Sequence, residues 1–230
     1  MKFGVITFPG SNCDQDMIYV LKHIMQSDVV NLWHKDHDLQ GCEFIILPGG
    51  FSYGDYLRSG AIARFSPIMQ EVIRFAEKGG YVLGICNGFQ ILTESQLLPG
   101  SLLHNHHQQF LCKNVYLRVE TTQSLITAGL TKGDVLKIPI AHGEGRYYAD
   151  EITLKMIEEN DQVLFRYCDG SGQVTNEANP NGAINHIAGV CNAQRNVFGM
   201  MPHPERCADT NLHNSDGRKL FESILKTVLV

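Results

Sequence analysis

A cysteine set between two glycines is the residue of this sequence whose type and spacing best suit nucleophilic chemistry. It is Cys86, in the run Gly84-Ile85-Cys86-Asn87-Gly88, where a predicted strand meets a predicted helix. Glycine two positions before and after a nucleophile is typical of a nucleophile elbow, here with cysteine in place of serine. The helix dipole favours a thiolate at that position. A buried structural cysteine beside ordinary loop glycines is the alternative.

His203 and Glu205 are suited to be the base that a thiolate needs and the group that orients this base. They stand two positions apart in Met201-Pro202-His203-Pro204-Glu205, after an apolar run. Residues i and i+2 of an extended segment face the same side, and the prolines favour an extended backbone. The spacing therefore predicts a carboxylate beside an imidazole. Taken alone, the run is explained nearly as well by a histidine in a surface salt bridge.

The segment Pro48-Gly49-Gly50 is the candidate partner of the elbow in binding an oxyanion. It follows a predicted strand, and the carboxyl ends of parallel strands form the ligand-binding edge of an open α/β sheet. The backbone N–H groups of Gly50 and Asn87 are therefore predicted to form an oxyanion hole. A plain turn between a strand and a helix is an equally good interpretation of the glycines alone.

Other clusters predict no metal and no nucleotide site. The histidines of His104-Asn105-His106-His107 cannot all face one ion, and no cysteine or carboxylate completes the set, so a solvated loop is expected. Gly143-Glu144-Gly145 and Gly170-Ser171-Gly172 lack the Lys-Ser/Thr of a phosphate-binding loop. Cys13 opens a predicted helix, but no histidine is evident as its partner, so it is interpreted as structural.

The composition argues against a nucleic-acid partner and against a membrane-spanning segment. The chain has 230 residues, 43% of them apolar, a formal net charge of −5 and no block of Lys or Arg, which argues against nucleic-acid binding. No apolar run approaches the roughly 18 residues of a membrane-spanning helix, and the first residues do not resemble a signal peptide. The seven cysteines are therefore expected to be reduced thiols of a cytoplasmic protein.

Strands that alternate with helices must position these residues. Such alternation predicts an α/β fold, a doubly wound, mostly parallel sheet flanked by helices, and one domain over residues 1–230. Ser11 or Asn12 is the expected N-cap of the first helix. The predicted strands cover residues 2–8, 29–33, 43–47, 81–85, 112–119, 135–140, 163–167, 187–191 and 197–200, and the predicted helices cover residues 12–24, 67–79, 87–95 and 220–228.

With these residues in view, the chain resembles the class I glutamine amidotransferases, which carry a cysteine elbow and a late His-x-Glu. Within them it is similar to the family of glutaminase subunits of phosphoribosylformylglycinamidine synthase, an enzyme of purine biosynthesis. The resemblance covers essentially the whole chain. Its motifs are the segments 8–14, 48–58 with 60–63, 84–90, 141–145, 178–182 and 200–206. Residues 104–109 depart from the family, because they are richer in histidine.

The resemblance implies a flavodoxin-like fold and a role for several residues. Cys86, His203 and Glu205 are implied to hydrolyse L-glutamine through a cysteine thioester. Residues 51–58 are implied to lie near a synthetase partner and the ammonia exit. Gly50 and Asn87 are implied to bind the oxyanion, Gln90 to hydrogen-bond the substrate, and the segment His142-Gly143-Glu144 to line its amino-acid end.

The family also implies the partners and cofactors. The ammonia is passed to a larger synthetase subunit, which makes formylglycinamidine ribonucleotide, and a small third subunit is expected. ATP and Mg are implied on the synthetase, with no cofactor and no metal in this chain.

Two other function classes remain as alternatives. A related cysteine hydrolase or peptidase of the same fold would share the elbow, but the late His-Pro-Glu and the glycine-rich segment after Leu47 fit it poorly. A non-catalytic thiol sensor or binding module would need no carboxylate to orient a histidine.

Overall fold

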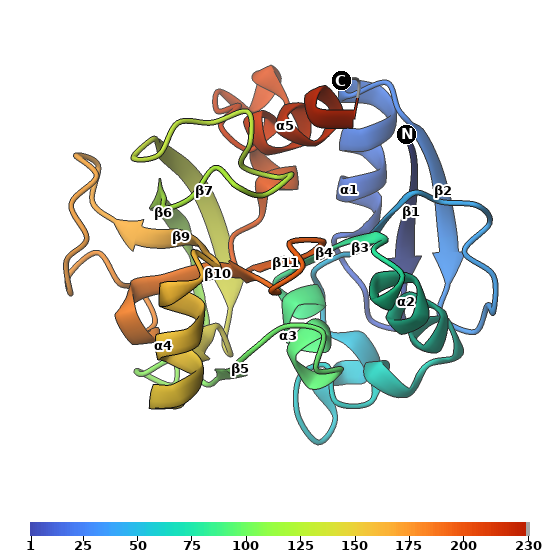
Figure 1. Ribbon diagram of the computed structural model, residues 1–230, viewed down its shortest axis with the longest axis horizontal. Coiled ribbons are helices and arrows are strands. Elements are labelled where there is room, and N and C mark those ends of the chain that lie inside the picture. Colours follow the sequence, from blue (N-terminus) through green and yellow to red (C-terminus); the bar gives the residue numbers. More distant parts are fainter. Residues whose placement is uncertain (229–230) are drawn as a thin grey trace.

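The computed structural model describes residues 1–228 (Figure 1). One nine-stranded sheet runs through both halves of the chain, in the order β2-β1-β3-β4-β11-β10-β9-β6-β7. Its strands are β1 (Lys2–Thr7), β2 (Asp28–Trp33), β3 (Phe44–Leu47), β4 (Tyr81–Ile85), β6 (Leu111–Val119), β7 (Val135–His142), β9 (Val163–Cys168), β10 (Ile187–Cys191) and β11 (Val197–Met200). Two further strands, β5 (Ser101–Leu103) and β8 (Arg146–Tyr148), form a separate two-stranded sheet.

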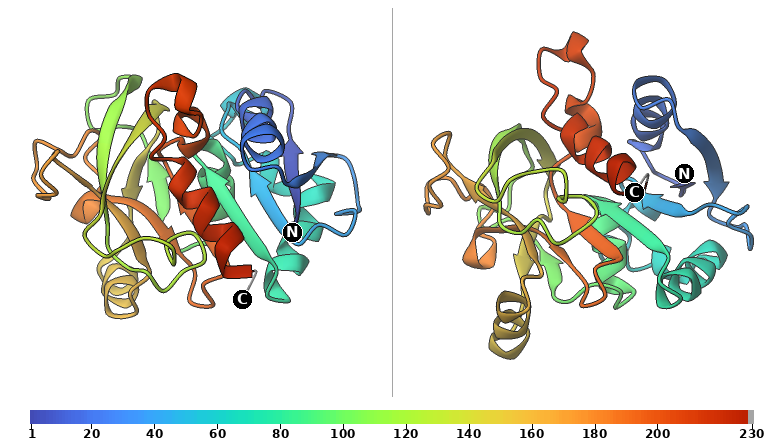
Figure 2. Two further views of the ribbon diagram at one scale, coloured as in Figure 1. Left: turned by 90° about the horizontal axis from the view of Figure 1, so that it is seen from above. Right: turned by 45° about the horizontal axis from the view of Figure 1, so that its top comes forward.

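Helices cover both faces of the parallel part of the sheet. The α-helices of the fold are α1 (Asp14–Tyr19), α2 (Pro67–Glu77), α3 (Asn87–Glu94), α4 (Glu151–Glu159) and α5 (Arg218–Val228). Figures 1 and 2 show α1 and α5 over one face and α2 and α3 over the other, while α4 lies beside the antiparallel strands. No helix within residues 1–228 is long and apolar enough to cross a membrane.

The sheet is parallel from β2 to β11 and antiparallel from β11 to β7. Burial along the strands explains the difference. All four residues of β3 are buried, as expected of a parallel strand covered on both faces, whereas β7 buries every second residue, which is typical of antiparallel strands. The predicted class, a doubly wound α/β sheet flanked by helices, is confirmed, and the antiparallel strands extend it at one edge.

The first helix begins later than the sequence predicts. Its N-cap is Cys13, whose side chain makes no capping hydrogen bond, so the expectation of Ser11 or Asn12 is wrong. The hydroxyl of Ser11 instead accepts a hydrogen bond from the backbone N–H of Phe8 at 3.0 Å. This bond stabilises the turn that precedes the helix. The helix continues as a wider, π-type turn over Val20–Ile24.

Three elements are not predicted by the sequence pattern. The strands β5 and β8 have three residues each and pair with one another across a separation of more than forty residues, which no local pattern encodes. The helix α4 buries Ile157 but leaves Ile152 and Met156 exposed, so its apolar stripe is too weak to be recognised.

Three neighbouring parallel strands, β3, β4 and β11, bring the candidate site together. Leu47 at the end of β3 pairs with Gly84, and Met200 at the end of β11 pairs with Ile85. The three strands therefore end at the same edge of the sheet, where ligands bind in open α/β folds. The segments that leave this edge carry Gly50, Cys86 and His203.

Candidate active site

Cys86 occupies the apex of a strained turn between β4 and α3. Its backbone has φ +51° and ψ −106°, a conformation that an L-residue with a side chain rarely adopts and that typically persists at functional sites. A Cβ atom at Gly84 would lie 2.6 Å from the carbonyl carbon of Gly88, and one at Gly88 would overlap the carbonyl oxygen of Leu47. Both positions therefore require glycine, and the structure has the form of the predicted elbow.

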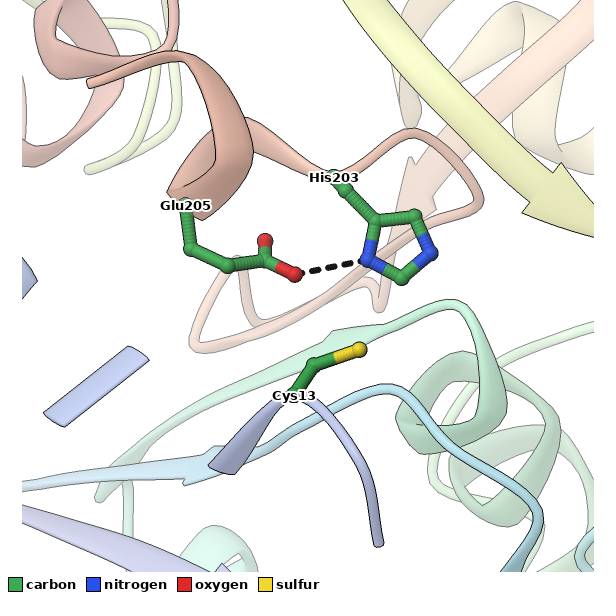
Figure 3. A group of neighbouring side chains, drawn as sticks. All are labelled: Cys13, His203 and Glu205. Carbon is green, nitrogen blue, oxygen red and sulfur yellow. Dashed lines mark hydrogen bonds and ion pairs between the residues drawn. The ribbon is translucent and has the colours of Figure 1, made fainter. Parts of the chain in front are cut away.

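His203 and Glu205 form the predicted pair. Nδ1 of His203 lies 2.6 Å from Oε1 of Glu205 (Figure 3), and both side chains are almost fully buried. The backbone is not extended as predicted, because Pro204 begins a short 3-10 helix, Pro204–Cys207, that contains Glu205. The two side chains meet even though Glu205 lies in a helical turn and not in an extended segment.

Electrostatics favours a charged imidazole at this position. Burial by itself would lower the pKa of His203, but the Glu205 carboxylate, followed by the charge of Cys86, outweighs it and raises the pKa well above the usual value. Nε2 of His203 has no hydrogen-bond partner within the described chain, and the thiol of Cys86 points to the carbonyl oxygen of Ala141 at 3.7 Å. The hydrogen bond between a nucleophile and its base is often long without substrate and shortens in the reacting complex.

Cys13 lies beside the same imidazole, so the expectation that it has no histidine partner is wrong. A Cβ atom at Gly49 would lie 2.6 Å from Cε1 of His203 and 3.1 Å from Sγ of Cys13, which shows how closely the three residues pack. Nη2 of Arg206 donates to Sγ of Cys13 at 3.1 Å. The contact joins residues 193 positions apart, and nothing in the local sequence indicates it.

Cys13, His203 and Glu205 are the one set of side chains within residues 1–228 spaced to share a metal ion, since one ligand atom of each lies within 4.8 Å of the others. Some of their possible ligand atoms already contact protein groups, whereas Nε2 of His203 and Oε2 of Glu205 have no hydrogen-bond partner within residues 1–228. Nδ1 of His203 is bonded to Glu205, and the Arg206 guanidinium places a positive charge against Cys13. The arrangement suits an ion-pair cluster around the imidazole.

The side chains of His104, His106 and His107 are exposed, as expected of a solvated loop.

A cavity of about 170 Å³ opens beside Cys86. Four of the predicted substrate-binding residues line it, namely Gly50, Gln90, His142 and Gly143. The remaining one, Asn87, is not part of the lining but hydrogen-bonds neighbouring residues. Its amide nitrogen donates to Oε1 of Gln90 at 2.9 Å, and its amide oxygen accepts from the N–H of Ser52 at 3.0 Å. Gln90 in turn donates to the carbonyl oxygen of Glu144 at 2.6 Å. One chain of hydrogen bonds therefore fixes both loops of the cavity relative to the elbow.

The two candidate oxyanion donors flank this cavity. Gly50 has φ +146°, and a Cβ atom there would lie 2.7 Å from the backbone nitrogen of Asn12, so only glycine fits this close approach. Asn87 is the first residue of α3, where backbone N–H groups have no partner inside the helix.

His142 is held as a neutral ring. Its Nδ1 lies 3.0 Å from Oδ1 of Asn105, an oxygen that also accepts from the N–H of Gly145, so Nδ1 carries the proton. Burial, with a further contribution from the charge of His203, lowers the pKa of His142 to about 4. Nε2 is therefore an acceptor, and it has no partner within residues 1–228.

Asp55 is a residue of the cavity that the sequence does not reveal, since the resemblance places its segment near a partner. Burial, and to a lesser degree the negative charge of Glu144, raises the pKa of Asp55 to about 6, against hydrogen bonds from Ser59 and Asn87 that favour the charged form. Its carboxylate accepts from the amide of Asn87 at 3.3 Å, which ties it to the residue next to the nucleophile.

Comparisons with known proteins agree with this geometry. Residues 1–225 match the model of the CobB/CobQ-like glutamine amidotransferase domain. Phosphoribosylformylglycinamidine synthase subunit PurQ of Koribacter versatilis is 57% identical over 98% of this chain and 97% of its own length. The protein of the same name from Gloeobacter violaceus is 56% identical over 100% of this chain and 99% of its own length.

Solved structures give the same result. A chain in the structure of PurLQS from Thermotoga maritima superposes with a TM-score of 0.86 at 42% identity, covering 99% of this chain and 98% of that one. Another protein of Thermotoga maritima, described as a glutamine amidotransferase, shares the fold at 13% identity, with a TM-score of 0.59 and coverage of 99% and 84%. The chain therefore belongs to the CobB/CobQ-like glutamine amidotransferase family, and within it to the PurQ subunits of phosphoribosylformylglycinamidine synthase.

Proposed function

We propose that this chain hydrolyses L-glutamine as the glutaminase subunit of a phosphoribosylformylglycinamidine synthase. The observation that carries the proposal is the cysteine at the strained apex, next to a buried His203–Glu205 pair joined at 2.6 Å. A buried carboxylate that orients a histidine is typical of nucleophilic catalysis. The family and the names of its relatives specify the amide and the pathway.

The proposed reaction has two stages. The thiolate of Cys86 attacks the carboxamide carbon of glutamine, and the oxyanion accepts hydrogen bonds from the N–H groups of Gly50 and Asn87. The imidazolium of His203 gives its proton to the nitrogen as the C–N bond breaks, which leaves ammonia and a glutamyl thioester. Neutral His203 then takes a proton from water, whose oxygen attacks the thioester carbon. Breaking of the C–S bond restores the thiolate beside the imidazolium and leaves a γ-carboxylic acid, which loses its proton to solvent as glutamate is released.

Glu205 holds the ring for both stages. Because its carboxylate binds Nδ1 of His203, the proton at that nitrogen stays in place and Nε2 is the nitrogen that exchanges protons. A buried negative charge also stabilises the imidazolium.

The proposal extends to the partners. Ammonia passes to a larger synthetase subunit, which binds ATP and Mg and makes formylglycinamidine ribonucleotide in the cytoplasm, and a small third subunit completes the complex. The name PurLQS, which one of the Thermotoga maritima structures carries, supports such an assembly. So do the highly exposed side chains of Tyr56 and Leu57, which follow Asp55 of the cavity lining, because exposed apolar residues in one segment are typical of a docking surface.

Ammonia bypass tests this function in the assembled complex. Cys86→Ala should abolish synthesis that depends on glutamine, while added ammonium still supports synthesis at the rate of the unmodified complex. Cys112→Ser is the matched control, because Cys112 is the exposed free cysteine among the described residues, and it should leave both rates unchanged. An equal loss of both activities in Cys86→Ala would contradict the proposal.

Labelling separates the glutaminase from a thiol sensor. A diazo ketone analogue of glutamine should modify Cys86 in a one-to-one ratio, and added glutamine should protect against it. Labelling that is spread over several cysteines and includes exposed Cys112 would instead support the sensor.

A further inference from the structure

The buried carboxylate of Glu205 fixes only one side of the His203 imidazole. Nδ1 lies 2.6 Å from Oε1 of Glu205, whereas Nε2 of the ring and Oε2 of the carboxylate have no hydrogen-bond partner within residues 1–228. A single hydrogen bond does not by itself prevent the ring from tilting about the line that joins these two groups. Because Nε2 must come close to the thiol of Cys86 for proton transfer, a further group is needed to limit the tilt.

Cys13 lies where it can limit this tilt. Its Sγ lies within 4.8 Å of a nitrogen of His203 and of a carboxylate oxygen of Glu205, and Figure 3 shows it pointing toward the edge of the ring that carries Nδ1. Gly49 packs against the same edge, since a Cβ atom there would lie 2.6 Å from Cε1 of His203. The sulfur and the backbone of Gly49 therefore restrict the imidazole together.

The position of Cys13 is itself closely determined. Its backbone N–H donates to the carbonyl oxygen of Gly49 at 3.2 Å, and its carbonyl oxygen accepts from the N–H of Met17 in α1 at 3.0 Å. The residue is 2% exposed, and Nη2 of Arg206 donates to Sγ at 3.1 Å. These hydrogen bonds hold the sulfur beside the imidazole.

Arg206 connects the same sulfur to the turn that carries the orienting carboxylate. It directly follows Glu205 in the 3-10 helix Pro204–Cys207. Besides donating to Cys13, its guanidinium lies 3.6 Å from Oδ2 of Asp16, so it joins this turn to the first turn of α1. A cysteine that only fills space in a core behaves as a small apolar residue and needs no charged donor. The contact with Arg206 therefore indicates a polar role for the sulfur.

We propose that Cys13 is a positioning residue for the catalytic base. Held by Arg206, its sulfur keeps the imidazole of His203 in the tilt that proton transfer requires, and the same contact keeps the turn of Glu205 against α1. The inference rests on the proposed glutaminase function. The electrostatics act in the same direction. Burial lowers the pKa of His203, while the charges of Glu205 and Cys86 raise it, and the neighbouring thiol of Cys13 raises it further.

A purely structural role for Cys13 makes a different prediction. If the residue only fills space, alanine should be tolerated, and serine, which buries a hydroxyl, should be the worse substitute. A positioning role reverses this order, because a serine hydroxyl still accepts from Arg206 and alanine offers no acceptor. Cys13 is not part of the cavity lining, so a positioning role also predicts a change in kcat without a change in KM.

The experiment measures kcat and KM for ammonia release from glutamine, together with synthesis from added ammonium, in the assembled complex. Cys13→Ala should lower kcat about 10- to 100-fold, the range expected for the loss of a hydrogen bond to a charged group. KM and synthesis from ammonium should change less than about twofold, because the lost contact acts on the chemical step. Cys13→Ser should keep kcat within about threefold of the unmodified complex, because the acceptor remains.

Cys42→Ala and Cys42→Ser are the matched controls. Cys42 is also a free, buried cysteine, and its Sγ packs against Gly4 in β1, so both changes should leave kcat and KM unchanged. A normal kcat in Cys13→Ala, or a kcat in Cys13→Ser no higher than in Cys13→Ala, would overturn the inference. An equal loss of synthesis from glutamine and from ammonium would assign Cys13 to the fold and would overturn it too.

Arg206→Met tests the same contact without a change at the buried cysteine. It keeps an unbranched side chain and removes every donor, so kcat should fall by a factor similar to that of Cys13→Ala. The double variant should lose no more than either single variant, because the contact is already absent. An unchanged kcat in Arg206→Met, or losses that multiply in the double variant, would contradict the inference. The proposed function fails in a different way, namely if the unmodified complex releases no ammonia from glutamine or if Cys86→Ala still does.

Discussion

Among single residues, Glu205 has two effects on His203: it orients the ring, and its charge stabilises the imidazolium. The carboxylate is buried against His203 at 2.6 Å, and its negative charge raises the pKa of the imidazole. A glutamine side chain has a similar shape but no charge, and it can hold the wrong tautomer. The role of Glu205 is therefore to fix both the protonation state and the orientation of the ring.

Glu205→Gln should lower the rate of glutamine hydrolysis about 10³- to 10⁴-fold, as the loss of the orienting carboxylate does in related triads. The measurement is kcat for glutaminase activity in the complex, with synthesis from ammonium as the internal reference. Glu222→Gln, which removes an exposed ion pair with Arg218, should change neither rate. A fall of less than tenfold in Glu205→Gln would show that Glu205 does not orient the base.

Asp55 allows a prediction about stability and pH. Its pKa is raised from 3.8 to about 6 in the folded chain, so between these values the folded state binds more protons than the unfolded state. The contribution of Asp55 to the free energy of unfolding therefore falls as the pH rises from about 4 to about 6. The negative charge of Asp55 is thus maintained at a cost to the stability of the free protein.

Asp55→Asn should consequently unfold at a higher temperature than the unmodified chain at pH 7, and this difference should be much smaller at pH 4. The amide keeps an oxygen that accepts from Asn87 and removes the charge. Thermal unfolding of both chains at the two pH values, without substrate, gives the comparison. Lower stability of Asp55→Asn at pH 7 would show that the charged carboxylate is stabilising.

At the scale of elements, the close approach of α3 to β3 determines where the nucleophile stands. Gly88 faces the carbonyl oxygen of Leu47 so closely that a Cβ atom would overlap it. A larger residue must push the helix away from the strand or unwind its first turn, and both movements displace Cys86. The glycine thus connects packing directly to the position of the thiol.

Gly88→Ala should lower the free energy of unfolding by about 1–3 kcal/mol, the usual cost of overpacking a core, and should reduce glutaminase activity more than synthesis from ammonium. Denaturant unfolding and the two assays provide the test. Gly170→Ala is the control, because its nearest neighbour would be an ordinary 3.5 Å from the new Cβ. Equal stability of both variants would contradict the proposed packing constraint.

The elements also show which parts of the fold a sequence can predict. The apolar run of β3 and the Pro67 and Gly79-Gly80 boundaries of α2 are local features, and they are predicted correctly. The pairing of β5 with β8 is decided by contacts between distant segments. The same holds in the site: the elbow and the His203–Glu205 pair have local patterns, whereas the contact of Cys13 with Arg206 joins opposite ends of the chain, and Asp55 is recognised only when its cavity is known.

For the whole molecule, the position of exposed apolar residues relative to the cavity indicates which face a synthetase partner covers. Tyr56, Leu57 and Phe65 follow the strand β3 and belong to the parallel part, where the cavity opens. Ile152 is equally exposed on α4, beside the antiparallel strands. If ammonia must pass from the cavity to a synthetase without loss, the partner has to cover the first group, and nothing requires it to cover Ile152.

Leu57→Asp should therefore weaken binding of the synthetase at least about tenfold, as the loss of an apolar anchor at the centre of an interface does, and should reduce synthesis from glutamine with it. The side chain is 82% exposed and its backbone has φ +70°, which aspartate tolerates better than leucine, so the free chain should remain as stable as before. Ile152→Asp, at 85% exposure, should leave both binding and synthesis unchanged. Sedimentation of the mixed subunits measures the affinity, and equal effects of the two substitutions would place the synthetase on a different face of the molecule.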